Sequence, residues 1–153
     1  MGDGTAGDSS TDCIAACGGP AVHGDWYLGG NGRAVEDYVN QAREFLEYSR
    51  IYLADGHLHQ ASEKGWGAAA HMAKAVALTQ GWDYSRHADF HVVMLNAAKR
   101  LGIASILPLK AVAEDLHGNF YRRKRFLAAE TIDFELRSVA ELLDALAPLA
   151  TAA

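Results

Sequence analysis

The sequence has few of the features that cross-link a protein through disulfides or direct it to a membrane. Its only two cysteines, Cys13 and Cys17, lie in the first 20 of 153 residues, so no disulfide can form in the rest of the chain. No apolar run is long enough to span a bilayer, because polar side chains interrupt even the longest low-charge stretch, residues 65–82. The chain begins with acidic residues, where a secretory signal has basic ones. We therefore expect a cytoplasmic protein that does not contact membranes.

Positive charge is also scarce. The chain has 14 Lys and Arg against 19 Asp and Glu, a formal net charge of -5. Nucleic-acid-binding proteins are usually basic, so any such role here must rest on a local patch. The concentrated basic run consists of Arg122, Arg123, Lys124 and Arg125. We predict that this run binds an anion or RNA, and the alternative is a solvated helix end.

Metal ligands are sparse as well. Cys13 and Cys17 have the spacing C-x₃-C, and His23 adds one nearby ligand. A structural zinc site takes four ligands, so a pair of free thiols is the favoured interpretation. We predict neither a metal nor a cofactor.

The composition divides the chain in two. Residues 1–32 are rich in Gly, Ser, Thr and Asp, and they cannot bury enough apolar surface to offset the entropy of ordering. We predict a flexible N-terminal segment over 1–32 and one helical domain over 33–149.

From residue 33 the apolar residues recur at three- and four-residue spacings. This pattern predicts helices over residues 33–55, 57–79, 87–101, 105–121 and 128–146. Gly56 and Gly102 are expected to end two of them, and Pro148 to end the last. The second helix contains many alanines and glycines, which allow close helix packing, with Trp66 as a core anchor. Short connections and no strand pattern predict an all-α fold, an antiparallel up-and-down bundle of four to five helices.

One stretch has residues suited to RNA cleavage. His117 and Tyr121 lie four apart, so they share a helix face, and Asn119 points elsewhere. Here His117 would act as general acid and base, Asn119 and Tyr121 would orient a phosphate, and a neighbouring arginine would stabilise charge. The simpler interpretation is that His117 is a core-edge histidine bonded to a neighbouring helix and Tyr121 is packing.

A second stretch begins the helix over 87–101. Arg86 and His91 have the spacing R-x₄-H, and His87 and His91 have the i, i+4 spacing of a two-histidine metal face. We take Arg86 and His91 as candidate binding residues. The alternative is an ordinary opening turn, with Asp89 near the positive end of the helix.

These stretches together resemble a known family. The run QAREFLEYSRIYLADGHLHQASEKGWGAAAHMAKAVA, followed by a break, a His-containing helix and LHGNFY, is similar to the PaREP family, which is grouped within the HEPN superfamily. The resemblance covers about residues 35–147. It implies a HEPN-like bundle of four or five helices that is often dimeric. It also implies either a metal-independent endoribonuclease with an R-x₄₋₆-H motif or a member that lost the motif and binds partners.

The position of His117 matches the late catalytic histidine of that superfamily. The region where the motif would have its arginine holds Leu109, Lys110, Ala111 and Val112, and the literal R-x₄-H at Arg86 and His91 lies one helix earlier. We therefore expect a non-catalytic or weakly catalytic module, a homodimer that binds RNA, a nucleotide or a protein partner. The alternatives are a metal-independent endoribonuclease and a structural helical adaptor.

Overall fold

The computed structural model describes residues 31–121 and 127–151, except for the side chains of residues 31–33, 120 and 121. The described residues form five helices and no strand: α2 (Asn31–Ala54), α3 (Leu58–Gln80), α4 (His87–Leu101), α5 (Ile106–Tyr121) and α6 (Ala129–Ala150). The prediction of an all-α fold is confirmed. The predicted flexible segment lies almost wholly outside the described residues. Within them, no helix combines the length and the apolar character that a bilayer crossing needs.

Glycines end three of the helices. Gly56, Gly81 and Gly102 have φ values of +79°, +71° and +68°, a left-handed conformation that side chains with a Cβ rarely adopt. After α2, the backbone N–H of His57 donates to the carbonyl of Tyr52 at 2.8 Å. Such bonds satisfy carbonyls that the end of a helix leaves open, so the turns follow directly from the glycines.

The end of α6 differs from the prediction. Pro148 was expected to end this helix, but Pro148 lies inside it and the helix continues to Ala150. Leu149 and Ala150 are buried, and two side chains at the end of α3 hold their carbonyls. Thr79 Oγ1 donates to Ala150 O at 3.1 Å, and Gln80 Nε2 donates to Leu149 O at 3.0 Å. These tertiary contacts outweigh the hydrogen bond that proline removes.

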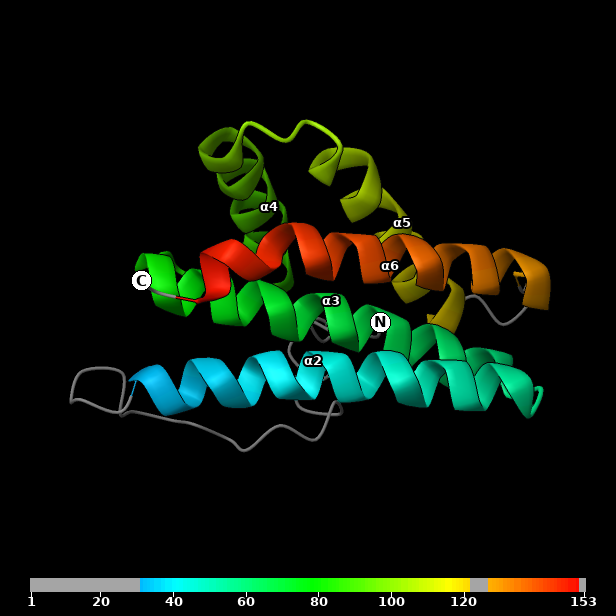
Figure 1. Cartoon of the computed structure of the whole chain (residues 1–153). Coiled ribbons are helices and arrows are strands. Elements are labelled where there is room, and N and C mark those ends of the chain that lie inside the picture. Colours follow the sequence, from blue (N-terminus) through cyan, green and yellow to red (C-terminus); the bar gives the residue numbers. More distant parts are fainter. Residues whose placement is uncertain (1–30, 122–126, 152–153) are drawn as a thin grey trace, which may run out of the picture.

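The arrangement is only partly up-and-down. Figure 1 shows α2, α3 and α6 lying alongside one another, with α4 standing across them. Here α2 and α3 are antiparallel, but α3 and α6 run in the same direction, since both end at the Thr79–Ala150 contact. The expected antiparallel order is therefore wrong for this pair. The physical reason is that α4 and α5 return the chain to the end of the molecule where α3 begins.

The core lies around α3, which packs on α2, α5 and α6. Its buried face consists mainly of alanine and glycine, so neighbouring helices come close. A Cβ on Gly65 would lie 2.5 Å from Leu136 Cδ2 and 3.0 Å from Leu116 Cδ1. The predicted close packing is confirmed, and Trp66 is a buried anchor as expected, with 3% of its surface exposed.

Candidate functional site

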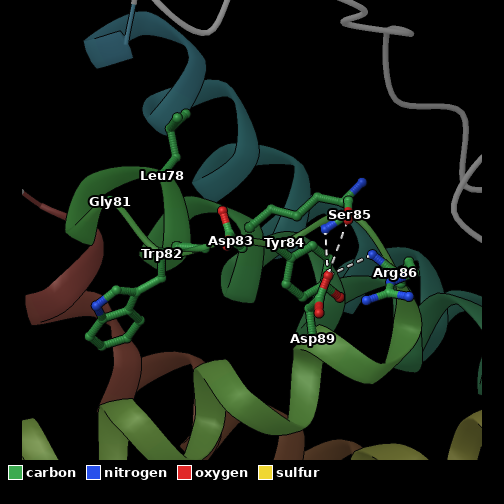
Figure 2. A pocket seen from close by; sticks show the side chains of 10 residues that line it. Leu78, Gly81, Trp82, Asp83, Tyr84, Ser85, Arg86 and Asp89 are labelled. Carbon is green, nitrogen blue, oxygen red and sulfur yellow. Dashed lines mark hydrogen bonds between the residues drawn. The ribbon is translucent and has the colours of Figure 1, made fainter.

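A cavity of about 530 Å³ lies where the end of α3 meets the start of α4. Its polar lining includes two cations, Lys74 and Arg86, and two carboxylates, Asp83 and Asp89. Trp82 and Tyr84 add two aromatic rings from the connecting loop. Figure 2 shows this loop, residues 81–86, passing from the end of α3 along the cavity. Opposite charges and aromatic rings therefore line the same cavity.

The start of α4 is fixed by Asp89. Its Oδ2 accepts hydrogen bonds from the backbone N–H groups of Ser85 at 2.8 Å and Arg86 at 2.9 Å, and from Ser85 Oγ at 3.3 Å (Figure 2). The two backbone N–H groups, Ser85 first, lower the pKa of Asp89 below its usual value. The Asp89 carboxylate is thus committed to holding the turn that carries Arg86 into the cavity wall.

The R-x₄-H residues do not meet. Arg86 lines the cavity, whereas His91 is exposed one turn further along α4 and is not among the cavity residues. The alternative interpretation of this stretch describes the local structure: α4 begins at His87, with Asp89 in its first turn. In the described part of the chain, no group of three His, Cys, Asp or Glu side chains is placed to hold a metal ion.

His117 lies in a second cluster, together with Trp66 and His87. Its ring stacks on that of His87, with 4.8 Å between ring centroids and 23° between planes, and lies 4.7 Å from the ring of Trp66. Burial, and then the neighbouring His87, lower the pKa of His117 to about 4. Both imidazoles are half-buried, and that of His117 is neutral at pH 7. The spacing of the sequence does not reveal this pair, because its members come from α4 and α5.

Asn119 is buried, with 2% of its surface exposed. Its Nδ2 donates to Ser62 Oγ at 2.6 Å, and its Oδ1 accepts from the backbone N–H of Leu127 at 2.7 Å. The amide therefore joins α3, α5 and the segment that leads into α6. The side chain of Tyr121 and the basic residues Arg122, Arg123, Lys124 and Arg125 lie outside the described residues.

Sequence reasoning also missed a pair of carboxyl groups on α5 and α6. Burial, and then a hydrogen bond with Asp115 and the charge of that group, raise the pKa of Glu135 to about 8. Glu135 borders a shallow cavity of about 430 Å³ beside Phe134, whose surface is 71% exposed. No motif marks this pair, since it depends on how α5 packs against α6.

The described fold and site define an all-helical protein with one mixed-charge, aromatic cavity at a helix corner. The chain belongs to the archaeal PaREP1/PaREP8 family, whose family model matches residues 37–143, more than half of the chain. No curated protein and no solved structure matches it. The family resemblance of the sequence is thus confirmed at the level of PaREP.

Proposed function

We propose that this protein is a HEPN-like helical module that binds RNA or a nucleotide in the α3–α4 cavity without cleaving it. The observation that carries the proposal is the joint presence of Lys74, Arg86, Trp82 and Tyr84 around one cavity. Ligand cavities in proteins are typically about 300–1,000 Å³, so a volume near 530 Å³ suits one nucleotide unit.

Each part of the ligand has a suitable partner. The Arg86 guanidinium and the Lys74 ammonium are donors for phosphate oxygens. The N-terminus of α4 adds its positive dipole on the same side, since Arg86 directly precedes that helix. Trp82 and Tyr84 offer π-faces, on which bases stack regardless of their identity. The site is therefore suited to binding, with affinity that falls as salt rises.

The predicted catalytic residues favour binding over cleavage. A general acid at neutral pH needs a pKa near 7, and that of His117 is about 4. Both polar atoms of the Asn119 amide already bind Ser62 and Leu127. These two observations support a module in which neither residue takes part in phosphate chemistry.

The test is equilibrium binding of a short single-stranded RNA and of AMP at low salt. Arg86→Ala removes a charge-assisted contact, so we expect affinity to fall about 10- to 100-fold, with a shallower salt dependence. The matched control is Arg100→Ala, an exposed arginine at the opposite end of α4. Equal losses in both variants, or no binding by the wild type, would refute the cavity as the site.

A metal-independent endoribonuclease is the second candidate, favoured by one contact. The structure stacks His117 on His87, and His87 directly follows Arg86 in the chain. This candidate predicts that wild-type protein cleaves RNA in the presence of chelator and that His117→Ala does not. If neither protein cleaves RNA, the endoribonuclease candidate is refuted and the binding module is the candidate that stands.

The homodimer and a protein partner stay predictions. Exposed large apolar side chains lie on four different helices: Tyr48 and Ile51 on α2, Val92 on α4, Leu107 on α5 and Phe134 on α6. Sedimentation of the full chain over a range of concentrations tests the dimer directly.

A further inference from the structure

We propose that the α5–α6 surface around Phe134 binds a basic segment of a protein partner, with an arginine side chain of that segment in the cavity that Phe134 and Glu135 line. This surface is separate from the α3–α4 cavity, with which it shares no lining residue. Two neighbouring side chains of α6 define it, one apolar and exposed and the other acidic and incompletely hydrogen-bonded.

Phe134 supplies the apolar part of the surface. Its side chain is 71% exposed, against 55% or less for the other exposed large apolar side chains among the described residues. A single exposed ring is ordinary, but this ring borders a cavity of about 430 Å³ that Val112 of α5 also lines. A partner group that enters the cavity therefore packs against the ring and covers apolar surface.

Glu135 lines the same cavity and has an unused hydrogen-bonding atom. A side-chain hydrogen bond joins it to Asp115 of α5. Within residues 31–121 and 127–151, however, no hydrogen bond reaches its buried Oε2. A buried carboxyl oxygen without a partner costs free energy. The last torsion of a glutamate is soft, so the group turns readily toward a donor that enters the cavity.

A guanidinium group matches both side chains. Its N–H groups donate to carboxyl oxygens, and its flat face packs on an aromatic ring. Its positive charge also favours the ionised form of Glu135, whose pKa in the free protein is about 8. Glu130 adds a second carboxylate to the cavity wall. A purely apolar group would leave Oε2 without a partner, and a phosphate would be repelled.

The charge of α6 indicates what kind of molecule carries the guanidinium. One basic residue, Arg137, stands against five acidic ones on this helix: Glu130, Asp133, Glu135, Glu141 and Asp144. Arg137 is already paired with Asp133 at 2.7 Å. The surface therefore attracts a basic segment and disfavours nucleic acid. It also disfavours a second copy of this chain, since a two-fold contact would place the same acidic helix on both sides.

The experiment uses the blocked peptide acetyl-ALRALRA-amide as the basic segment. It is titrated calorimetrically into the full chain at low salt and pH 8.5, above the pKa of Glu135. In the control peptide, both arginines are replaced by citrulline, which has nearly the same shape as arginine but no charge. We expect the wild type to bind the arginine peptide about tenfold more tightly, the size of one charge-assisted hydrogen bond.

Four variants locate the binding surface. Glu135→Gln keeps the shape of the side chain and should remove the tenfold preference, and Phe134→Ala should weaken binding of the arginine peptide about fivefold. The matched controls are Glu141→Gln, which removes an exposed carboxylate of α6, and Val92→Ala, which trims an exposed apolar side chain of α4. Each control should change the affinity by less than about twofold.

Several outcomes would contradict the proposal. They are no binding by the wild type, equal affinity for the two peptides, and losses in the two controls as large as those in Glu135→Gln and Phe134→Ala. Sedimentation tests the other occupant: a wild-type dimer that Phe134→Ala dissociates would assign the surface to a second copy of the chain and refute a basic partner. The titrations with RNA and AMP probe the α3–α4 cavity, so the two proposals fail independently.

Discussion

The buried face of α3 and the corner that follows its last residue differ in nearly every physical property. The long buried face has alanines, glycines and Trp66, and its buried titratable group, His71, donates through Nδ1 to the carbonyl of Gly67 at 2.8 Å. Burial lowers the pKa of His71 to about 4, so the core stays uncharged at pH 7. The corner after Gly81 instead gathers cations, carboxylates and rings around a cavity. Stability and binding should therefore be separable by mutation.

The largest effect is expected from the core. Leu142 on α6 is fully buried, and Leu142→Ala leaves a cavity that should cost about 2–5 kcal/mol in the free energy of unfolding. Urea denaturation measures the loss, and the exposed neighbour Glu141→Ala is the control. Under conditions where the variant is folded, its affinity for AMP should equal that of the wild type. A changed affinity would show that core and corner are coupled.

The second effect tests the role of Asn119. Asn119→Ala leaves the buried Ser62 hydroxyl without its amide donor and the Leu127 N–H without its acceptor, which should cost about 1–3 kcal/mol. If the residue is structural, Ser62→Ala should be partly non-additive with it in a double-mutant cycle of unfolding. A variant with unchanged stability but impaired binding or cleavage of RNA would show that Asn119 has a functional role and not a structural one.

A third test uses the pH dependence of α5–α6 packing. Because the pKa of Glu135 is raised to about 8, the folded state keeps a proton that the unfolded state has lost above its ordinary pKa near 4.5. The contribution of Glu135 to stability should therefore fall as pH rises from about 4.5 to 8 and then level off, and above about pH 6.5 this fall should be visible in the stability of the whole protein. Glu135→Gln removes this slope, and we expect a gain of about 1 kcal/mol at pH 8, much less than the full shift because the group is only half-buried.

The matched control for that test is Glu130→Gln, since Glu130 is exposed in the first turn of α6. Thermal unfolding at pH 5, 6.5 and 8 compares the three proteins. A wild type whose stability rises steadily over this range would contradict the protonated state of Glu135. At the acid end, His71 and His117 act in the opposite sense: their lowered pKa values remove stability as pH falls from about 6.5 to 4.

Much of the fold follows from local signals, and the exceptions have specific physical causes. The bounds of α4 are predicted correctly, because Asp89 and Gly102 mark its two ends. The end of α6 is predicted wrongly from Pro148, because hydrogen bonds from Thr79 and Gln80 hold the last turn of that helix. Arg86 is predicted as a binding residue and does line the cavity, but the cavity depends on the angle of α4. The His87–His117 and Asp115–Glu135 pairs likewise need tertiary packing to meet.

The smallest effect should come from an exposed ion pair on the surface of α6. Arg137 Nη2 lies 2.7 Å from Asp133 Oδ2 on α6, with side chains 72% and 50% exposed, so Arg137→Ala should change stability by about 0.5 kcal/mol or less. Lys110 and Glu114 form a pair of similar length, at 2.8 Å, but only 12% and 34% of their side-chain surfaces are exposed. Lys110→Ala should therefore cost more than Arg137→Ala in the same urea titration. In RNA binding, Arg137→Ala should match the wild type at every salt concentration. A loss like that of Arg86→Ala would mean that affinity comes from general positive surface and not from the α3–α4 corner.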